Sequence, residues 1–347
     1  MKLAYLSFSL QEKNLKFKNK IVKNVNLNEI IQPVKEELIE FERSFKRTMF
    51  SKVKLLNIIV HYILRQKGKR IRPTLVFLSA KLVGDINEST FHAATLVELL
   101  HTATLIHDDV VDESDMRRGF PSLNAIWGNK VAVLVGDFFL AQGLLLSLKN
   151  KEYKFLHITS EAVRRMSEGE LLEIQSARGN SIDEEIYFRI ISDKTASLIS
   201  TCCELGAVSA TDDESVAYKL KNFGENLGIA FQLRDDLLDY MGDSNITGKP
   251  VGSDIREGKI TLPLIYALKN SPGKEARRVI KIIKNNPKIK DIYFVIDFVK
   301  AYGGIDYTLK VAEDYLERAK QFIVDFSESP AKESLIKLTN FVLERVS

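Results

Sequence analysis

Residues 99–112 read LLHTATLIHDDVVD, an apolar run that closes with three aspartates. Within it, Leu99, Leu100, Ala103 and Ile106 recur three or four positions apart. Because a helix completes a turn every 3.6 residues, this spacing places the four side chains on one face and predicts a helix. The aspartates are therefore embedded in an apolar helix and do not belong to a polar loop.

The same helical spacing continues along the chain, for example at Leu198, Ile199, Cys202 and Leu205. Evidence for strands is thin, because alternating apolar and polar runs are short and no Asn-Gly or Asp-Gly turn separates two β-branched segments. Glycine and proline interrupt the helical pattern at 84–85, 118–121, 271–273, 286–287 and 303–304. We therefore predict an all-α fold.

The composition favours one large folded unit. Of the 347 residues, 45% are hydrophobic and only 8 are proline and 18 glycine, so a large core can form without long linkers. Residues 1–27 are rich in lysine and poorly periodic, and they contain no secretion signal. We expect residues 1–27 to form an N-terminal extension and residues 28–347 to form a single domain.

One apolar stretch is long enough to raise the question of a membrane span. Residues 131–148 read VAVLVGDFFLAQGLLLSL, close to the roughly 20 residues that cross a bilayer. Asp137 and Gln142 interrupt it, and an ionisable side chain in the middle of a bilayer is costly. We therefore predict a buried helix at the centre of the fold and no stable membrane insertion.

Charge and cysteine content narrow the setting. The chain has 50 basic and 46 acidic residues, a net charge of +4, and this near balance gives no signature of a nucleic-acid partner. The only cysteines, Cys202 and Cys203, are adjacent, so they provide neither a disulfide framework nor the spaced pairs of a zinc site. We expect two small buried residues in a reducing, cytoplasmic protein.

The aspartate motif occurs twice. DDVVD at 108–112 is matched by DDLLD at 235–239, the latter within the apolar stretch GIAFQLRDDLLDY. The first and last carboxylates of each motif are four residues apart, so on a helix they can reach one cation. Oxygen ligands of this kind suit Mg²⁺. A solvated acidic helix end, as in 183–185, is the alternative, but unpaired carboxylates would be costly in such apolar surroundings.

Basic residues gather in compact groups before and after these acids. They are Lys69 and Arg72 in the turn GKRIRP, Arg117 and Arg118 five residues after the first acidic motif, and the single residues Lys194, Lys249 and Lys259. Arginine and lysine bind phosphate oxygens, so acidic metal-binding motifs with basic groups indicate a diphosphate site. Neither GxxxxGK[ST] nor GxGxxG occurs, so ATP and dinucleotides are not indicated.

These motifs, in this order, resemble the trans-isoprenyl diphosphate synthases, specifically the long-chain polyprenyl synthases. The resemblance covers residues 28–347 and rests on GKRIRP at 68–73, ELLHTATLIHDDVVDESDMRRG at 98–119, SEGELLE at 167–173, DKTASL at 193–198, FQLRDDLLDY at 231–240 and GKPVGSDIREGKITLP at 248–263. It implies an isoprenoid-synthase-type helical bundle around a deep central cavity, normally a homodimer, with both acidic motifs at the cavity mouth.

The resemblance also implies roles for individual residues. The metal site, with two or three Mg²⁺ ions, would comprise Asp108, Asp112 and Asp235 as direct ligands together with Asp239. The wider catalytic group would comprise Asp108, Asp109, Asp112, Arg117, Lys194, Asp235, Asp236 and Lys249. Isopentenyl diphosphate would contact Lys69, Arg72, His101 and Arg118, and the allylic diphosphate would contact Arg117, Lys194, Thr195, Gln232, Lys249 and Lys259.

The implied reaction ionises an allylic diphosphate, joins it to isopentenyl diphosphate and releases a longer linear all-trans product. Where such an enzyme has a bulky aromatic residue four or five positions before the first motif, this chain has Thr104 and Ala103. We therefore expect a deeper cavity, with Leu99 in its wall, and a product of six to ten units. A geranylgeranyl diphosphate synthase is the shorter alternative, and a catalytic subunit of a heteromeric enzyme also remains open.

Three other classes explain the sequence less well. A metal-dependent phosphohydrolase of the HD type would use His107-Asp108 but leaves the second motif unexplained. A terpene cyclase shares the aspartates but has no use for the cations of an isopentenyl diphosphate site, and a non-catalytic subunit would be expected to have lost some of these residues.

Peripheral membrane contact during product release is compatible with the composition.

Overall fold

The computed structural model describes residues 26–66, 68, 70–117, 119–179, 183–241, 251–285 and 287–344. The first helices are α2 (Leu27–Ile31), the 3₁₀ helix η1 (Gln32–Val34), α3 (Lys35–Met49), α4 (Lys54–Arg65), α5 (Ile71–Val83), α6 (Glu88–Val111), α7 (Leu123–Trp127) and α8 (Asn129–Lys149). The middle of the chain forms α9 (Tyr153–Gly179), α10 (Glu184–Ile191), the π-helix η2 (Ser192–Ala196), α11 (Ser197–Ala210) and α12 (Glu214–Met241). The last helices are α14 (Ser253–Arg256), α15 (Leu262–Asn270), α16 (Gly273–Lys284), α17 (Ile289–Ala301), α18 (Gly304–Ile323) and α19 (Pro330–Glu344).

The predicted all-α fold is confirmed. Within the described ranges, the strands are limited to a hairpin of two residues on each side, β1 (Met116–Arg117) and β2 (Phe120–Pro121). The predicted breaks near residues 84, 272 and 303 fall between helices, at the ends of α5, α15 and α17. Of the predicted extension 1–27, only Asn26 and Leu27 are described, and Leu27 already begins α2.

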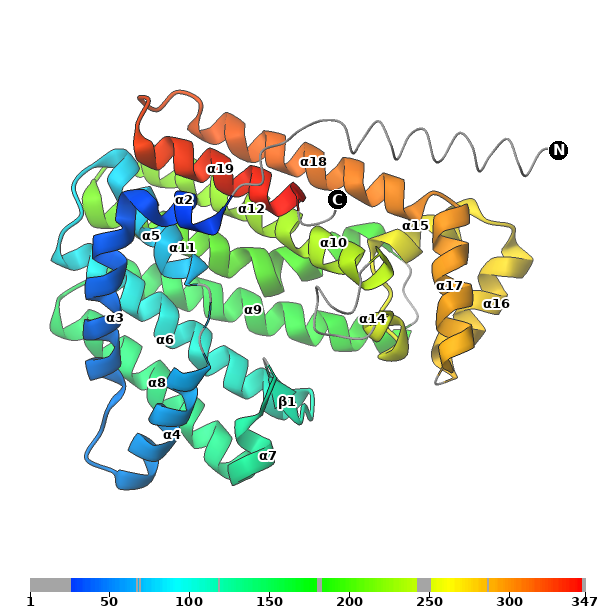
Figure 1. The fold of residues 1–347 in the computed structure, drawn as a ribbon, viewed down its shortest axis with the longest axis horizontal. Helices are drawn as coiled ribbons and strands as arrows, with labels where there is room; N and C mark the ends of the chain where they lie inside the picture. The colour runs from blue at the N-terminus through cyan, green and yellow to red at the C-terminus, as the bar shows by residue number, and fades with distance from the viewer. Residues whose placement is uncertain are drawn as a thin grey trace.

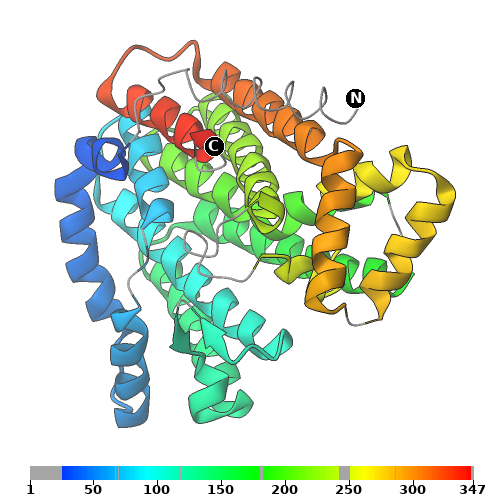
Figure 2. The same ribbon diagram turned by 45° about the vertical axis from the view of Figure 1, so that its right-hand side comes forward.

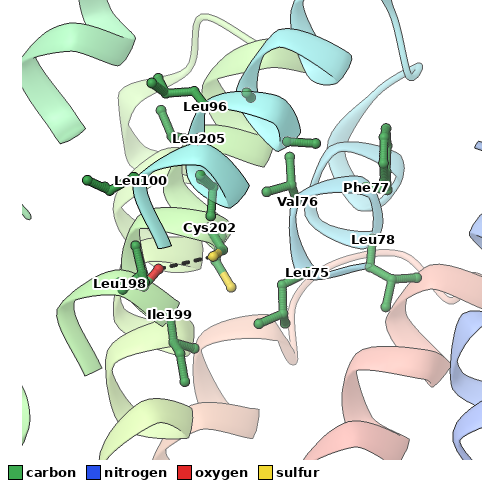
Figure 3. Close-up of a cluster of buried hydrophobic side chains, with 14 of the residues drawn as sticks. Leu75, Val76, Phe77, Leu78, Leu96, Leu100, Leu198, Ile199, Cys202 and Leu205 are labelled. Carbon is green, nitrogen blue, oxygen red and sulfur yellow. Dashed lines mark hydrogen bonds between the residues drawn. The ribbon is translucent and has the colours of Figure 1, made fainter. Parts of the chain in front are cut away.

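The central element is α11, which packs against α5, α6, α9 and α12. Figure 1 shows these helices running side by side through the middle of the bundle. Nearly every residue of α11 is buried, and Cys202 and Cys203 are fully buried, as predicted. In Figure 3, Leu198 and Cys202 of α11 lie among side chains of α5 and α6, such as Leu75 and Leu100, and the Cys202 thiol donates to the Leu198 carbonyl at 3.0 Å.

Small residues allow this close packing. A Cβ atom on Gly206 of α11 would lie 2.3 Å from the Val76 carbonyl oxygen of α5, and one on Gly224 of α12 would lie 2.7 Å from Ser200 Cα of α11. Both contacts are backbone contacts that a side chain could not relieve, so these glycines set the spacing between the helices. The composition of α11, SLISTCCELGAVSA, thus explains why it can be surrounded.

The prediction for residues 131–148 is wrong about their position. They do form a helix, α8, but only 33% of its most apolar 18-residue stretch is buried. One face packs on α6, whereas Val133, Leu134, Leu144, Leu145 and Leu148 on the other face are exposed. This helix is long and apolar enough to cross a membrane by length and composition alone, which is weak evidence because core helices pass the same test. It lies at the boundary of the bundle and not at its centre.

The C-terminal helices close the bundle. The long helices α12 and α18 pack together, and α15 connects them to α17. At one end, α16 and α17 stand side by side, away from the central layer (Figures 1 and 2). A separate core cluster holds this end together, with Val279 and Ile283 of α16 against Ile292, Val295 and Ile296 of α17.

Candidate active site

The first acidic motif lies at the C-terminal end of α6, with Asp112 as the C-cap. A helix C-terminus carries partial negative charge, and the aspartates add to it, so this end of α6 favours a cation. Asp108 and Asp112 lie one turn apart, half-buried and exposed respectively. Burial raises the pKa of Asp108 to about 6, with Glu170 and Asp112 adding repulsion that Lys194 and Arg117 only partly offset.

The Asp109 side chain binds an arginine of the neighbouring hairpin. It is buried, and Arg117 Nε donates to its Oδ1 at 2.5 Å. Arg117 comes from the β1–β2 hairpin, in which Arg117 pairs with Phe120 and Gly119 adopts a φ of +77°, a conformation that favours glycine. Asp109 therefore fixes the hairpin to α6, and it leaves Asp108 and Asp112 as the accessible carboxylates of this motif.

Lys194 lies on the π-helix η2, and π-helical turns often occur at functional sites. Its Nζ is 2.7 Å from Glu170 and 2.5 Å from Glu173, both on α9. Burial would lower the pKa of Lys194, but Glu173 and Glu170 together raise it, so the ammonium stays charged. Through Glu170, which also acts on Asp108, this group connects η2 and α9 to the first motif.

Glu170 and Glu173 were not among the predicted site residues. They belong to the SEGELLE segment on which the family resemblance partly rests, but without a role assigned to them. Their spacing of three residues on a helix was a signal that both could reach one partner. What the sequence alone did not reveal is that this partner is Lys194.

The second acidic motif lies near the end of α12, and its three aspartates have different surroundings. Asp235 is exposed. Asp236 is buried and accepts hydrogen bonds from Tyr187 at 2.5 Å and from Gln232 at 2.8 Å. Both oxygens of Asp236 are thus engaged by protein groups.

Asp239 binds the start of α14. One of its oxygens accepts from the backbone N–H and the hydroxyl of Ser253, at 2.8 and 2.9 Å, and the other accepts from the Asp254 N–H at 3.1 Å. These bonds fix the start of α14. They give Asp239 a structural use, so its assignment as a metal ligand gains no support from the geometry and stays a prediction.

Asp236 predicts a pH dependence of stability. Burial raises its pKa in the folded protein to about 8, although hydrogen bonds from Tyr187 and Gln232 oppose the shift, whereas an unfolded Asp titrates near 3.9. Between these values the folded state binds the extra proton, so the free energy of unfolding should fall as the pH rises, by up to about 1.4 kcal/mol per unit. We expect urea unfolding in EDTA to show this slope between about pH 5 and 8.

The Asp236→Asn variant supplies the comparison for that measurement, because it cannot titrate. Its free energy of unfolding should vary less steeply with pH than that of the unmodified protein over the same interval. Equal slopes for the two proteins would show that Asp236 does not carry this proton.

A cavity of about 1070 Å³ brings both halves of the site together. The predicted residues in its wall are Asp112, Lys194, Thr195, Gln232, Asp236 and Lys259, and Glu170 and Glu173 join them. Thr195 donates to Gln232 at 2.9 Å, and Gln232 continues this chain of hydrogen bonds to Asp236. Lys259 pairs with Glu257 at 2.8 Å. The predicted Lys249 lies outside the described residues.

The donor set fits a hard divalent cation. Within the described part of the chain, no three His, Cys, Asp or Glu side chains already form a cluster that could hold a metal ion by themselves. The acids are nevertheless crowded, since Glu170 and Asp112 both raise the pKa of Asp108. Carboxylates arranged in this way suit an ion that takes only some ligands from the protein and the rest from water and substrate phosphates.

Two of the four residues predicted for isopentenyl diphosphate are described, and they lie together. Arg72 Nη1 is 2.9 Å from His101 Nε2, which connects the start of α5 to α6. Beside them Arg70 pairs with Glu98 and has a φ of 53°. Lys69 and Arg118 lie outside the described residues.

The residues predicted to set product length differ in exposure. Ala103 and Leu99 are fully buried, whereas Thr104 retains some exposed surface. Val163 and Met166 on α9 are also only partly buried. Of these three predicted residues, Thr104 is the one that is not fully buried. His107 contacts α8, with Nε2 3.3 Å from the Val133 carbonyl and 3.5 Å from Asp137.

Comparisons with known proteins agree with this architecture. The polyprenyl synthetase family model matches residues 53–298. The chain is 36% identical to octaprenyl diphosphate synthase of Escherichia coli K12, over 92% of this chain and 99% of that protein.

Two solved structures are also similar. Decaprenyl diphosphate synthase of Rhodobacter capsulatus has a TM-score of 0.87 and 34% identity, with 93% of this chain and 100% of that chain covered. A polyprenyl synthase of Caulobacter crescentus, complexed with calcium and isoprenyl diphosphate, has a TM-score of 0.86 and 34% identity, with 94% and 99% covered. This chain belongs to the polyprenyl synthetase family, and it is a prenyl-transferring enzyme with the all-α isoprenoid-synthase fold.

Proposed function

We propose that this enzyme condenses isopentenyl diphosphate with an allylic diphosphate and builds a linear all-trans polyprenyl diphosphate of six to ten units in the cytoplasm. The observation that carries the proposal is the cavity in which Lys194, Lys259 and Gln232 lie beside acids of both aspartate motifs. The long-chain products in the names of similar proteins support the length. Residues 28–347 would act as one catalytic domain.

Asp108, Asp112 and Asp235 are the proposed ligands of two or three Mg²⁺ ions, because their side chains are more exposed than those of Asp109 and Asp236. Bound Mg²⁺ would act as a Lewis acid that draws charge onto the allylic diphosphate. Asp109 and Asp236 position their neighbours, through Arg117 and through Gln232 and Tyr187. The calcium in the Caulobacter structure is consistent with a divalent cation in this family.

The cations have separate tasks in this proposal. Lys194, Thr195, Gln232, Lys249, Lys259 and Arg117 would bind the allylic diphosphate and stabilise the charge that develops as its carbon–oxygen bond breaks. Lys69, Arg72, His101 and Arg118 would orient isopentenyl diphosphate so that its double bond attacks the allylic carbon. The double bond is itself the nucleophile, and the proton lost in this step would leave with the released pyrophosphate, so the reaction requires neither a protein nucleophile nor a protein base.

Incubation of the purified enzyme with Mg²⁺, labelled isopentenyl diphosphate and farnesyl diphosphate tests this function. Chromatography of the dephosphorylated products should show a ladder that ends at six to ten units. A ladder that stops at four units would establish the geranylgeranyl alternative. Absence of incorporation would point to a heteromeric enzyme, and absence of incorporation with candidate partner subunits present would refute prenyl transfer as the function.

Thr104 gives a test of product length. In the Thr104→Phe variant an aromatic ring would extend from α6 into the space that Thr104 borders, so we expect the main product to shorten to four units or fewer. The Thr104→Ser variant keeps a small hydroxyl side chain and should keep the original length. Chromatography of the products of both variants checks this, and an unchanged ladder for Thr104→Phe would exclude Thr104 from the cavity wall.

We also propose that the enzyme is a homodimer that buries the exposed face of α8. That face offers Val133, Leu134, Leu144, Leu145 and Leu148 on one helix, and a cluster of exposed apolar side chains of this kind is typical of an interaction site. A second copy of the chain is the proposed occupant, because the resemblance implies a homodimer and an isologous contact needs only one such face. Light scattering of the purified enzyme distinguishes dimer from monomer.

A further inference from the structure

Positive charge is concentrated at one end of the molecule, in residues 273–300. This segment contains eight basic and three acidic residues, a net charge of +5, whereas the whole chain has a net charge of only +4. The segment comprises α16 and all of α17 except its last residue. Residues 1–27 carry the same net charge, from six lysines and one glutamate, so the residues outside these two segments have a net charge of −6. Within the described part of the chain, the segment 273–300 is therefore a marked concentration of positive charge.

The charge lies on one face of α16. At 100° per residue, Lys274, Arg277, Arg278, Lys281 and Lys284 fall within about a third of the helix circumference. All five are exposed, while Val279 and Ile283 on the opposite side are buried. Among the described residues, Arg277 and Lys281 form no ion pair. The face therefore presents a cationic surface that the protein does not neutralise.

This surface continues onto α17. The Arg278 guanidinium lies over the Phe294 ring, 4.5 Å from its centroid, so the edge of the basic face adjoins α17. Farther around α17, Lys290 is exposed, and two large apolar side chains, Ile289 and Tyr293, are 66% and 59% exposed. A basic helix face next to exposed apolar and tyrosine side chains is the composition of helices that lie on membrane surfaces.

The other edge of the face borders the active-site cavity. Lys284 and, on the buried side of α16, Ile280 and Ile283 line the 1070 Å³ cavity that contains Lys194. The cationic face thus meets the cavity at the edge that carries Lys284. Whatever binds this face lies close to the site of prenyl transfer.

We propose that α16 and the exposed side of α17 form a docking surface for membranes rich in anionic phospholipids. The basic residues of α16 contact lipid phosphates, while Ile289 and Tyr293 enter the headgroup region. Binding through this surface holds the cavity beside the bilayer. That last consequence rests on the proposed function, since only a long apolar product would need the membrane, but lipid binding itself does not require catalysis.

Sedimentation with vesicles tests the surface directly. The full-length enzyme, without substrates, is expected to bind vesicles of phosphatidylcholine that contain about 30% phosphatidylglycerol, which gives an anionic surface. It should not bind vesicles of phosphatidylcholine alone. Each basic residue near an anionic surface strengthens binding about fivefold. The R277E/K281E variant should therefore bind at least about 25-fold more weakly, and salt should weaken the binding of the unmodified enzyme.

Two control variants test whether the loss of binding comes from this surface, from the change in net charge or from the N-terminal extension. R43E/R47E reverses two exposed arginines with the same spacing on α3. K18E/K20E reverses two lysines of the extension. Both should change vesicle binding less than about threefold. Circular dichroism checks the folding of each variant, and R277Q/K281Q replaces R277E/K281E if that variant does not fold.

The apolar part of the surface has its own variant, I289S/Y293S, which keeps every charge. It is expected to bind anionic vesicles about tenfold more weakly with an unchanged salt dependence, because the lost contribution is burial of apolar area. The proposal is overturned if the enzyme does not bind anionic vesicles, if R43E/R47E weakens binding as much as R277E/K281E, or if only K18E/K20E weakens it. An enzyme that lacks prenyl transfer but shows the expected vesicle binding would contradict the proposed function and leave this surface in place.

Discussion

The Asp108→Asn variant is expected to lower kcat/KM for prenyl transfer about 10³-fold, because one preorganised electrostatic group at the reacting diphosphate contributes several kcal/mol to the transition state. The Mg²⁺ concentration for half-maximal rate should rise as well. Stability should not fall, because burial and the repulsion from Glu170 and Asp112 already disfavour the Asp108 charge in the folded protein without metal. Steady-state kinetics over a Mg²⁺ series and thermal unfolding in EDTA measure the two effects separately.

Asp212→Asn is the control for this variant. Asp212 lies in the turn between α11 and α12, is fully exposed, and pairs only weakly with Lys154 at 3.3 Å, so kinetics and stability should both stay near those of the unmodified enzyme. If Asp108→Asn kept more than about a tenth of the activity, the metal role of Asp108 would be wrong. If it lost activity and stability together, a general folding defect would explain the loss better.

Periodicity predicted the helices well because most of them are amphipathic. The exceptions are helices that are apolar on all sides. Residues 131–148 and α11 are both strongly apolar, and hydrophobicity alone favoured the first as the central helix. The structure has α11 in that position, because its serines, alanines and Gly206 let neighbouring backbones approach, whereas the large leucines of α8 project outward. The size of the side chains, and not their hydrophobicity, therefore determines which of the two helices lies at the centre.

Motif spacing predicted that the two acidic motifs would lie near one cavity, but it did not predict which partners the individual aspartates of each motif would have. Asp108 and Asp109 are adjacent and chemically identical, yet Asp109 pairs with Arg117 because the hairpin returns the chain to α6. Asp236 is buried because Tyr187, 49 residues away, donates to it. Such long-range partners do not appear in a local pattern, and this is also why Glu170 and Glu173 were missed as partners of Lys194.

The second large effect is expected at Arg165, which connects α9, η2 and α12. From α9, its Nε donates to Asp193 of η2 at 2.8 Å, and its Nη2 donates to Ser192 at 2.9 Å and to Glu225 of α12 at 2.7 Å. These bonds hold the π-helical turn that presents Lys194 to the cavity. Arg165 is thus a positioning residue, not a group that touches substrate.

The Arg165→Met variant keeps an apolar stem but leaves Asp193 and Glu225 without their main cation in a partly buried setting. We expect a loss of about 2–3 kcal/mol in the free energy of unfolding, between the values for exposed and fully buried ion pairs. Because Lys194 would lose its fixed position, kcat should also fall about 10²-fold. Urea unfolding and steady-state kinetics measure the two losses.

Arg164→Met is the matched control, since it makes the same substitution one residue earlier on the same helix. Arg164 is mostly exposed and pairs only with Glu161 and Glu168, within one turn of its own helix. Such pairs contribute about 0.5 kcal/mol or less, so this variant should keep its stability and its kcat. Equal losses in the two variants would mean that the network around Arg165 does not support η2. A loss confined to Arg165→Met would establish that the position of Lys194 depends on the salt bridges of Arg165 as well as on those of Lys194 with Glu170 and Glu173.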